Sequence, residues 1–132
     1  MSHTLELPPR TRLTPQRQAV LDAVASLHGR FTLVEVYDRA RRREPRLSLA
    51  TVYRTVDLLR RTGSVRPLPA EGQATYVHCR RGHHHHLVCT GCGAVEETTL
   101  CAAPSAAELK ARHGFVAASH ELDIYGLCER CS

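Results

Sequence analysis

The sequence predicts an α+β protein, with an N-terminal winged helix-turn-helix domain and a small C-terminal α/β domain held together by metal-binding thiols. Three observations lead to this prediction. Helix-start and helix-stop residues recur through the first 63 residues, two short strand-like segments follow, and two Cys-x-x-Cys pairs lie in the remainder of the chain. We expect the domains to comprise residues 1–78 and 79–132.

Three helices are predicted in the first domain, each beginning at a hydroxyl N-cap residue and ending near a glycine or a proline. With their caps they comprise residues 14–28, 32–42 and 48–61. Pro15 follows the first cap at a position that favours proline. Thr32 and Glu35 have the spacing of a capping box. Local signals therefore indicate where all three helices begin.

Two short strands, residues 64–68 and 74–78, are predicted on either side of a turn at residues 70–73. Three helices followed by a β-hairpin form the winged helix-turn-helix arrangement. The helix of residues 48–61 then occupies the recognition position.

The second domain is predicted to combine short strands with one helix. We expect strands at residues 84–88 and 95–98, which pair across a glycine-containing turn. Ser105 and Glu108 have capping-box spacing and open a helix that ends at Gly114. A further strand is expected over residues 116–125, leading into the last cysteine pair.

Length and cysteine use limit the class of protein. The 132 residues contain no apolar run near the 18 residues that a membrane-spanning helix needs. The first residues lack the apolar core and cleavage pattern of a secretory signal. Six cysteines without such a signal favour reduced thiols and metal binding over disulfides. We therefore expect a cytoplasmic protein with no membrane segment.

Positive charge is concentrated in the first domain. Residues 1–78 carry 13 arginines, no lysine and seven acidic residues, for a net charge of +6, whereas residues 79–132 have a net charge of −1. The planar guanidinium group matches phosphates and base edges. A basic half joined to a metal-binding half suggests nucleic acid at one end and a metal sensor at the other. The alternative is a merely solvated basic surface.

Four cysteines have the spacing of a closed zinc site. In each Cys-x-x-Cys pair, two intervening residues allow both sulfurs to reach one ion from a tight turn. Two disulfides are the alternative, which the missing secretory signal disfavours. Four thiolates fill a tetrahedral coordination sphere, so this zinc is expected to be structural. The predicted ligands are Cys89, Cys92, Cys128 and Cys131.

Four consecutive histidines, residues 83–86, precede the first cysteine pair. If they begin a strand, alternation places His84 and His86 on one face and the other two on the opposite face. The run then contributes to two separate metal sites. Cys79 and Glu97 are candidate partners for the His84 and His86 face, and one thiolate, two imidazoles and one carboxylate suit zinc.

His83 and His85 require partners on the other face of that strand. His120 is the candidate third ligand, and Cys101 is a candidate fourth. Cys101 is also interpretable as a packed small apolar residue or as a redox-sensitive thiol. Glu108 is expected to cap its helix rather than to bind metal.

Several motifs together resemble the ferric uptake regulator family over about residues 10–131. They are TPQR at residues 14–17, ATVYRT at 50–55, HHHHLVC-x-x-C at 83–92, GF at 114–115, His120, and GLC-x-x-C at 126–131. The resemblance implies a homodimeric, metal-dependent repressor with a winged-helix DNA-binding domain and an α/β dimerisation domain. It also implies a hinge metal site that controls DNA affinity.

Within the family the chain is most similar to the zinc uptake regulators. Cys79 stands where such regulators have a thiolate ligand, and the histidine of iron and peroxide sensors is replaced near Arg30. Two departures concern the metal sites. Arg66 stands where some zinc-sensing relatives have a hinge ligand, which favours Glu97 as the substitute. The usual glutamate of the additional site aligns near residues 103–104, which leaves that site either incomplete or completed by Cys101.

The resemblance implies a zinc-responsive transcriptional repressor of metal-uptake genes that is not an enzyme. Its operator would be an AT-rich inverted repeat in double-stranded DNA. The expected DNA contacts are Arg17, Ser48, Thr51, Tyr53, Arg54 and Arg66. Alternatives are an iron-, manganese-, nickel- or peroxide-sensing member, a zinc buffer or chaperone, and a zinc hydrolase or deaminase. The closed cysteine site has no open position for catalysis, which disfavours the enzyme.

Overall fold

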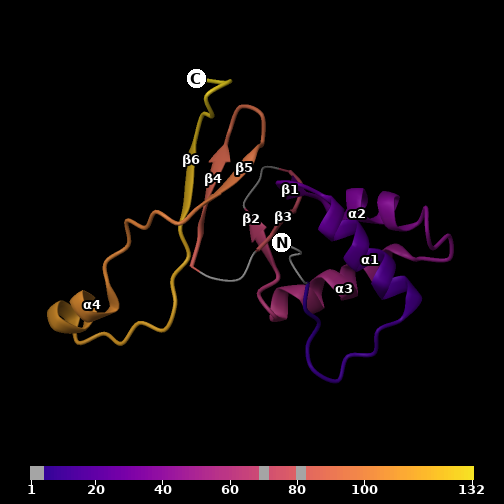
Figure 1. The fold of residues 1–132 in the computed structure, drawn as a ribbon, viewed down its shortest axis with the longest axis horizontal. Helices are drawn as coiled ribbons and strands as arrows, with labels where there is room; N and C mark the ends of the chain where they lie inside the picture. Colours follow the sequence, from indigo (N-terminus) through magenta and orange to yellow (C-terminus); the bar gives the residue numbers. More distant parts are fainter. Residues whose placement is uncertain (1–4, 69–71, 80–82) are drawn as a thin grey trace. The chain divides into compact units, whose positions relative to one another are not determined.

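A computed structural model describes residues 5–68, 72–79 and 83–132. The chain divides into two compact units, residues 1–81 and 82–132. Figure 1 shows helices gathered in the first unit and strands dominating the second. No helix in the described part of the chain is both long and apolar enough to cross a lipid bilayer.

The first unit contains three helices and a small antiparallel sheet. Its elements are α1 (Pro15–Ser26), β1 (Arg30–Phe31), α2 (Leu33–Ala40), α3 (Leu49–Arg61), β2 (Val65–Leu68) and β3 (Thr75–His78). The strand order is β1-β3-β2. This is the predicted winged helix-turn-helix domain, and α3 occupies the recognition position. Of the predicted turn at residues 70–73, residues 70 and 71 lie outside the described part of the chain.

The helix starts follow the predicted caps. Thr14 Oγ1 accepts from the Arg17 amide at 3.2 Å. Thr32 and Glu35 form a reciprocal capping box, with both hydrogen bonds present. These side chains satisfy amides that have no partner within the first turn of a helix.

A continuous apolar core holds the first unit together. Side chains from all three helices and from β1 and β2 contribute to it, including Val20, Val36, Val56, Phe31 and Val65. Burial of these groups is the main source of stability for the unit. The unit therefore positions α3 without help from metal.

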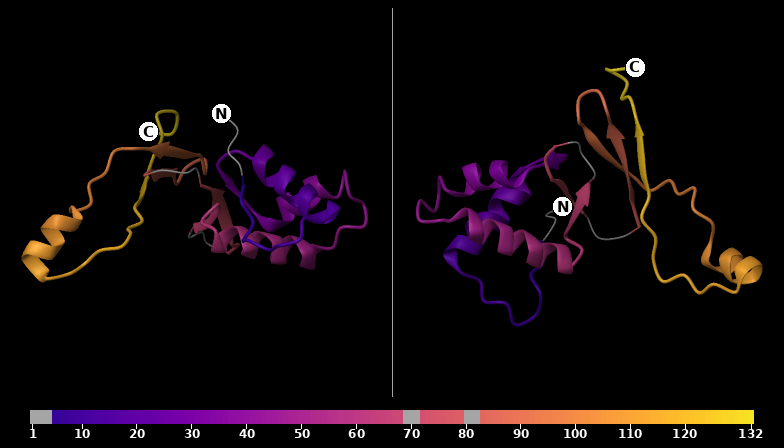
Figure 2. Two further views of the ribbon diagram at one scale, coloured as in Figure 1. Left: turned by 60° about the horizontal axis from the view of Figure 1, so that its bottom comes forward. Right: turned by 180° about the vertical axis from the view of Figure 1, so that it is seen from behind.

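The second unit has a three-stranded sheet and one helix. Its elements are β4 (His85–Cys89), β5 (Val95–Thr98), α4 (Ala106–His113) and β6 (Asp123–Gly126). β4 is central, antiparallel to β5 and parallel to β6. Figure 2 shows from two further sides that α4 stands away from this sheet at the end of two connecting segments.

Two local predictions need correction, and one strand was missed. The strand predicted at 116–125 is ordered as β6 only from Asp123, because β4 offers pairing partners only as far as His86. The capping box at Ser105 is half formed: Ser105 Oγ accepts from the Glu108 amide at 3.1 Å, whereas the Glu108 carboxylate pairs with Arg112 at 3.4 Å. Strand β1 was not predicted, since two residues show no periodicity.

Candidate metal centres and nucleic-acid interface

The four paired cysteines converge in the second unit. Their sulfur atoms all lie within 4.8 Å of one another, and the Sγ atoms of Cys92 and Cys128 are 3.8 Å apart. A tetrahedral zinc ion with bonds of about 2.3 Å requires sulfur–sulfur distances of about 3.8 Å. None of these four cysteines forms a disulfide. The arrangement fits a four-thiolate zinc site and not a pair of disulfides.

Strand pairing brings the two Cys-x-x-Cys turns together. Cys89 ends β4 and lies in register with Gly126 of the parallel strand β6, so the last cysteine pair emerges beside the first. Gly91 allows the close approach, because a β-carbon there would lie 3.1 Å from both Cβ and Sγ of Cys131. A larger residue at position 91 would therefore require the opposite turn to shift by a few tenths of an ångström.

Cys89 and Cys131 differ widely in thiol pKa. Amides of Cys92 and Cys128 donate to Cys89 Sγ at 3.4 Å each, and these bonds lower the pKa of Cys89 to about 6. Hydrogen bonds from its thiol to Cys128 and the other sulfurs raise the pKa of Cys131 to about 12. Without a metal ion, the four crowded thiols are therefore only partly ionised. A divalent cation would allow all four thiols to ionise.

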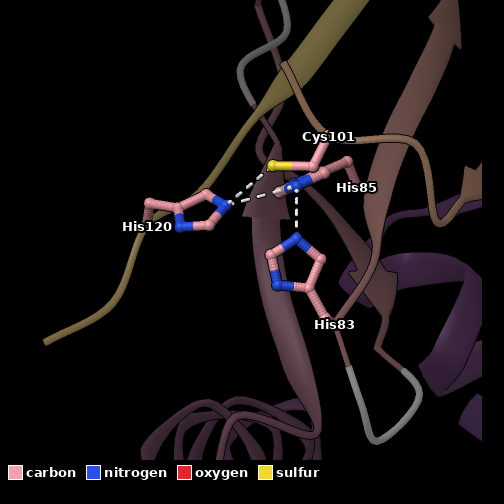
Figure 3. A group of neighbouring side chains, drawn as sticks. All are labelled: His83, His85, Cys101 and His120. Carbon is pink, nitrogen blue, oxygen red and sulfur yellow. Dashed lines mark hydrogen bonds between the residues drawn. The ribbon is translucent and has the colours of Figure 1, made fainter. Parts of the chain in front are cut away.

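A second group of candidate metal ligands in the second unit consists of three imidazoles and one thiol. Figure 3 shows His83, His85, Cys101 and His120 turned toward one another. His85 Nε2 lies 3.0 Å from His83 Nε2 and 3.3 Å from His120 Nε2. Cys101 Sγ lies 3.4 Å from His120 Nε2. All four ligand atoms are within 4.8 Å of one another.

These distances match a tetrahedral ion with mixed ligands. Zinc bonds of about 2.05 Å to nitrogen and about 2.3 Å to sulfur imply separations of about 3.3 Å between nitrogens and about 3.5 Å between nitrogen and sulfur. Cys101 is exposed, so its interpretation as a packed apolar residue is wrong. Three nitrogen ligand atoms and one sulfur atom directed at a common point form a soft metal-binding set.

Burial keeps His85 in the form that binds metal. The side chain is only 2% exposed, and desolvation, followed by the nearby His83 and His120, lowers its pKa below 6.5. Its Nδ1 atom is buried and has no hydrogen-bond partner among the described residues. The neutral ring is therefore favoured near pH 7, with a ligand lone pair available.

His84 and His86 form a separate pair on the opposite face of the strand. Their ring centroids are 5.1 Å apart. Sequence reasoning missed Asp123, whose Oδ1 lies 3.5 Å from His86 Nδ1. Asp123 is in register with His86 through the parallel pairing of β6 with β4, and only that pairing reveals it. A carboxylate at Nδ1 favours the tautomer that presents Nε2 to a metal ion.

The two remaining candidate ligands of this face lie in different units. Glu97 is in register with His86 across the β4–β5 pair, so their side chains share a face of the sheet. Its carboxylate does not join a group of clustered ligand atoms among the described residues. Cys79 follows β3 in the first unit. Cys79 and His84 are five residues apart in the sequence, so the connecting peptide limits the distance between their Cα atoms to about 17 Å.

The predicted DNA contacts lie on the first unit. Thr51, Tyr53 and Arg54 belong to α3, and Tyr53 is 56% exposed, so it does not pack against the first helix. Ser48 caps this helix: its Oγ accepts from the Thr51 amide at 3.2 Å. Arg17 lies in the first turn of α1 and is half-buried. Arg66 lies on β2 in register with Val77.

A winged-helix unit joined to a thiolate- and imidazole-rich unit defines a metal-binding protein of the transcription-regulator class. The model of the ferric uptake regulator family matches residues 9–125. The chain belongs to this family of metal-responsive transcription regulators. Its members are transcription regulators.

Relatives of the chain have different named functions. The chain is 37% identical over 122 residues to the zinc uptake regulation protein of Mycobacterium tuberculosis, covering 91% of this chain and 94% of that protein. It is 30% identical over 122 residues to the peroxide operon regulator of Bacillus subtilis, covering 92% and 84%. The solved ferric uptake regulator of Vibrio cholerae is similar with a TM-score of 0.63 and 26% identity, covering 89% of this chain and 92% of that one.

Proposed function

We propose that this chain is a zinc-responsive repressor that binds an operator in double-stranded DNA when its regulatory metal site is filled. The observation that carries the proposal is that four consecutive histidines divide at the start of β4 into two groups, His83 with His85 and His84 with His86. A single structural ion would not need two imidazole pairs. The arrangement therefore suits a protein that responds to metal as well as being stabilised by it.

Zinc is favoured by the chemistry of the ligands. The regulatory set comprises the Cys79 thiolate with His84 and His86, and Glu97 is the candidate fourth ligand. Thiolate and imidazole suit zinc better than a hard cation, whereas a carboxylate-rich set suits manganese or magnesium. Similarity to a zinc uptake regulation protein agrees with this choice. The genes repressed would then be those for metal uptake.

Cys79 gives the site its connection to the DNA-binding unit. It directly follows β3, which pairs with β2, and β2 in turn follows α3 along the chain. Zinc supplies a common point of attachment for ligands from both units. Cys79, His84 and His86 would then restrict how the units are oriented, and the filled site favours DNA binding if that orientation matches the operator.

The second unit is suited to pairing with another copy of the chain. Large apolar side chains are exposed on it, with Leu100 81% exposed and Val116 75% exposed. Others are Leu87, Phe115, Ile124, Tyr125 and Leu127. An apolar surface of this kind is typical of a protein interface. A two-fold dimer would present two copies of α3 to successive turns of DNA, which requires an inverted repeat; we expect it to be AT-rich.

Replacing Cys79 tests the function. We expect Cys79→Ser to lose zinc-dependent binding to the chain's own promoter region in a gel-shift titration, because the ligand from the first unit is removed. Cys101→Ser is the matched control, since it removes an exposed thiol from the other histidine group and should keep the zinc response at saturating zinc. Size-exclusion chromatography should show that both variants remain dimers.

Three outcomes would contradict the proposal. Wild-type protein that binds the promoter equally with zinc and with a chelator is not zinc-responsive. An unchanged zinc response in Cys79→Ser would show that the regulatory site lies elsewhere. A response to iron, manganese or nickel but not to zinc would assign the chain to another branch of the family.

A further inference from the structure

A hollow of about 350 Å³ lies on the first unit where the start of α1 meets the first turns of α3. Arginines surround it from four separate positions along the chain: Arg12 before α1, Arg17 in α1, Arg46 before α3 and Arg54 in α3. We call these four residues and the space between them the arginine hollow. Neither Arg12 nor Arg46 was among the predicted DNA contacts.

The arginine hollow has no acidic residue in its described lining. Within the described part of the chain, Arg12, Arg46 and Arg54 make no ion pair with a carboxylate, and the Arg17 guanidinium donates to the backbone oxygen of Arg12. Other arginines of the unit are neutralised, as in the Arg43–Asp22 pair at 3.4 Å. Four cations around one space repel one another, and a bound anion would relieve that repulsion.

A neighbouring hollow shows that this charge pattern is not general. It lies where α1 meets α2 and is also rich in arginine, with Arg39, Arg42 and Arg43 in its lining. Asp22 lies in the same lining and pairs with Arg43. Surface arginines alone therefore do not account for the unbalanced charge of the arginine hollow.

Polar groups at the arginine hollow match a phosphate group. Gln16 and Thr51 contribute an amide and a hydroxyl, and Thr51 Oγ1 lies 3.5 Å from Arg54 Nη2. The N-terminal ends of α1 and α3, with their positive dipole ends, both adjoin the space. Guanidinium forks bind phosphate oxygens in pairs, so the chemistry favours a phosphate over a carboxylate or halide.

We propose that the arginine hollow binds one phosphate of the DNA backbone, next to the groove that α3 enters. This inference rests on the proposed function. Arg46 and Arg12 hold the phosphate together with Arg17, and the contact fixes the register of α3 on the duplex. Tyr53 lies outside the hollow, so it is available for base edges while the hollow holds the backbone.

The salt dependence of DNA binding tests the proposal. We expect Arg46→Gln, in the zinc-loaded full chain, to weaken binding to promoter and random duplexes by the same factor. The slope of log affinity against log salt should become shallower by about 1. The ratio of wild-type to variant affinity should therefore fall about 4-fold between about 50 mM and about 200 mM salt. Arg12→Gln should behave alike.

Arg43→Gln is the matched control, because it removes the same charge from the same connecting segment but from a residue already paired with Asp22. It should leave the slope unchanged. An equal change in slope for Arg43→Gln would show that the effect depends only on the net charge of the protein, and it would overturn the proposal. A loss of affinity confined to the promoter duplex would show that Arg46 contacts bases. An unchanged slope of log affinity against log salt in Arg46→Gln would show that Arg46 does not contact the DNA.

A titration with inorganic phosphate separates DNA from a small anion as the ligand. Stoichiometric phosphate binding that Arg46→Gln abolishes, with unaltered DNA slopes, would identify a small-anion site and overturn the proposal. A wild-type protein that binds no duplex in the presence of zinc would instead refute the proposed function itself. The two failures are therefore distinguishable.

Discussion

Cys101 differs in its partners from the four paired cysteines. Cys89, Cys92, Cys128 and Cys131 lie among sulfurs, whereas the sulfur of Cys101 lies 3.4 Å from a ring nitrogen of His120. The residue comes two positions before the place where the family's glutamate is expected. A thiolate there would replace a hard oxygen ligand by a soft one, which narrows the choice of metal toward zinc.

We expect Cys101→Ser to weaken zinc binding at the His83, His85 and His120 site by about 10-fold or more, since loss of a direct ligand should exceed the loss of an outer partner. Cobalt substitution provides the measurement, because a thiolate bound to cobalt gives a charge-transfer band in the near ultraviolet. The variant should lose the part of that band assigned to this site and keep the part from the four-cysteine site. An identical spectrum would show that Cys101 is not a ligand.

At the scale of elements, the parallel pairing of β6 with β4 builds most of the second unit. It places the last cysteine pair beside Cys89, and it places Asp123 beside His86. His120 lies in the segment that leads into the same strand. A strand of only four residues therefore contributes to all three candidate metal groups of this unit.

Asp123→Asn keeps the shape of the side chain but removes its charge. We expect the zinc affinity of the site that contains His84 and His86 to fall about 10-fold, because the carboxylate no longer holds the His86 tautomer. Competition with a zinc chelator of known affinity measures this change. Glu96→Gln on β5 is the control, since Glu96 is exposed and is one residue out of register with His86. Equal affinities in both variants would exclude a role for Asp123.

Elements with strong local signals were predictable from the sequence. Thr14, Thr32 and Ser48 mark three helix starts, because each cap depends on a side chain and an amide only three residues away. β1 and the true extent of β6 were not predictable. A strand extends only as far as its neighbour offers hydrogen-bond partners, and that neighbour is distant in the sequence.

At the scale of the whole molecule, the two units depend on different sources of stability. The first has a continuous apolar core, whereas in the second the buried side chains include His85, His86, Val88 and Cys89. A small unit with few buried apolar groups needs another source of stability, and metal bonds supply it in many small domains.

Removal of metal should therefore affect the units unequally. With a strong chelator, or in Cys128→Ser, we expect the second unit to lose its tertiary structure while the first keeps a cooperative melting transition. Differential scanning calorimetry combined with zinc analysis measures both effects. Unaltered melting of a fully zinc-free protein would contradict a structural zinc ion at the four cysteines.

The sequence by itself determined the winged-helix fold, the pairing of the two Cys-x-x-Cys motifs and the division of the histidine run, because these depend on caps, spacing and strand alternation. Only the tertiary structure set Asp123 beside His86 and gathered four arginines around one hollow. Such contacts join residues that are distant in the chain. Their geometry is set by strand pairing and helix packing, which no local pattern contains.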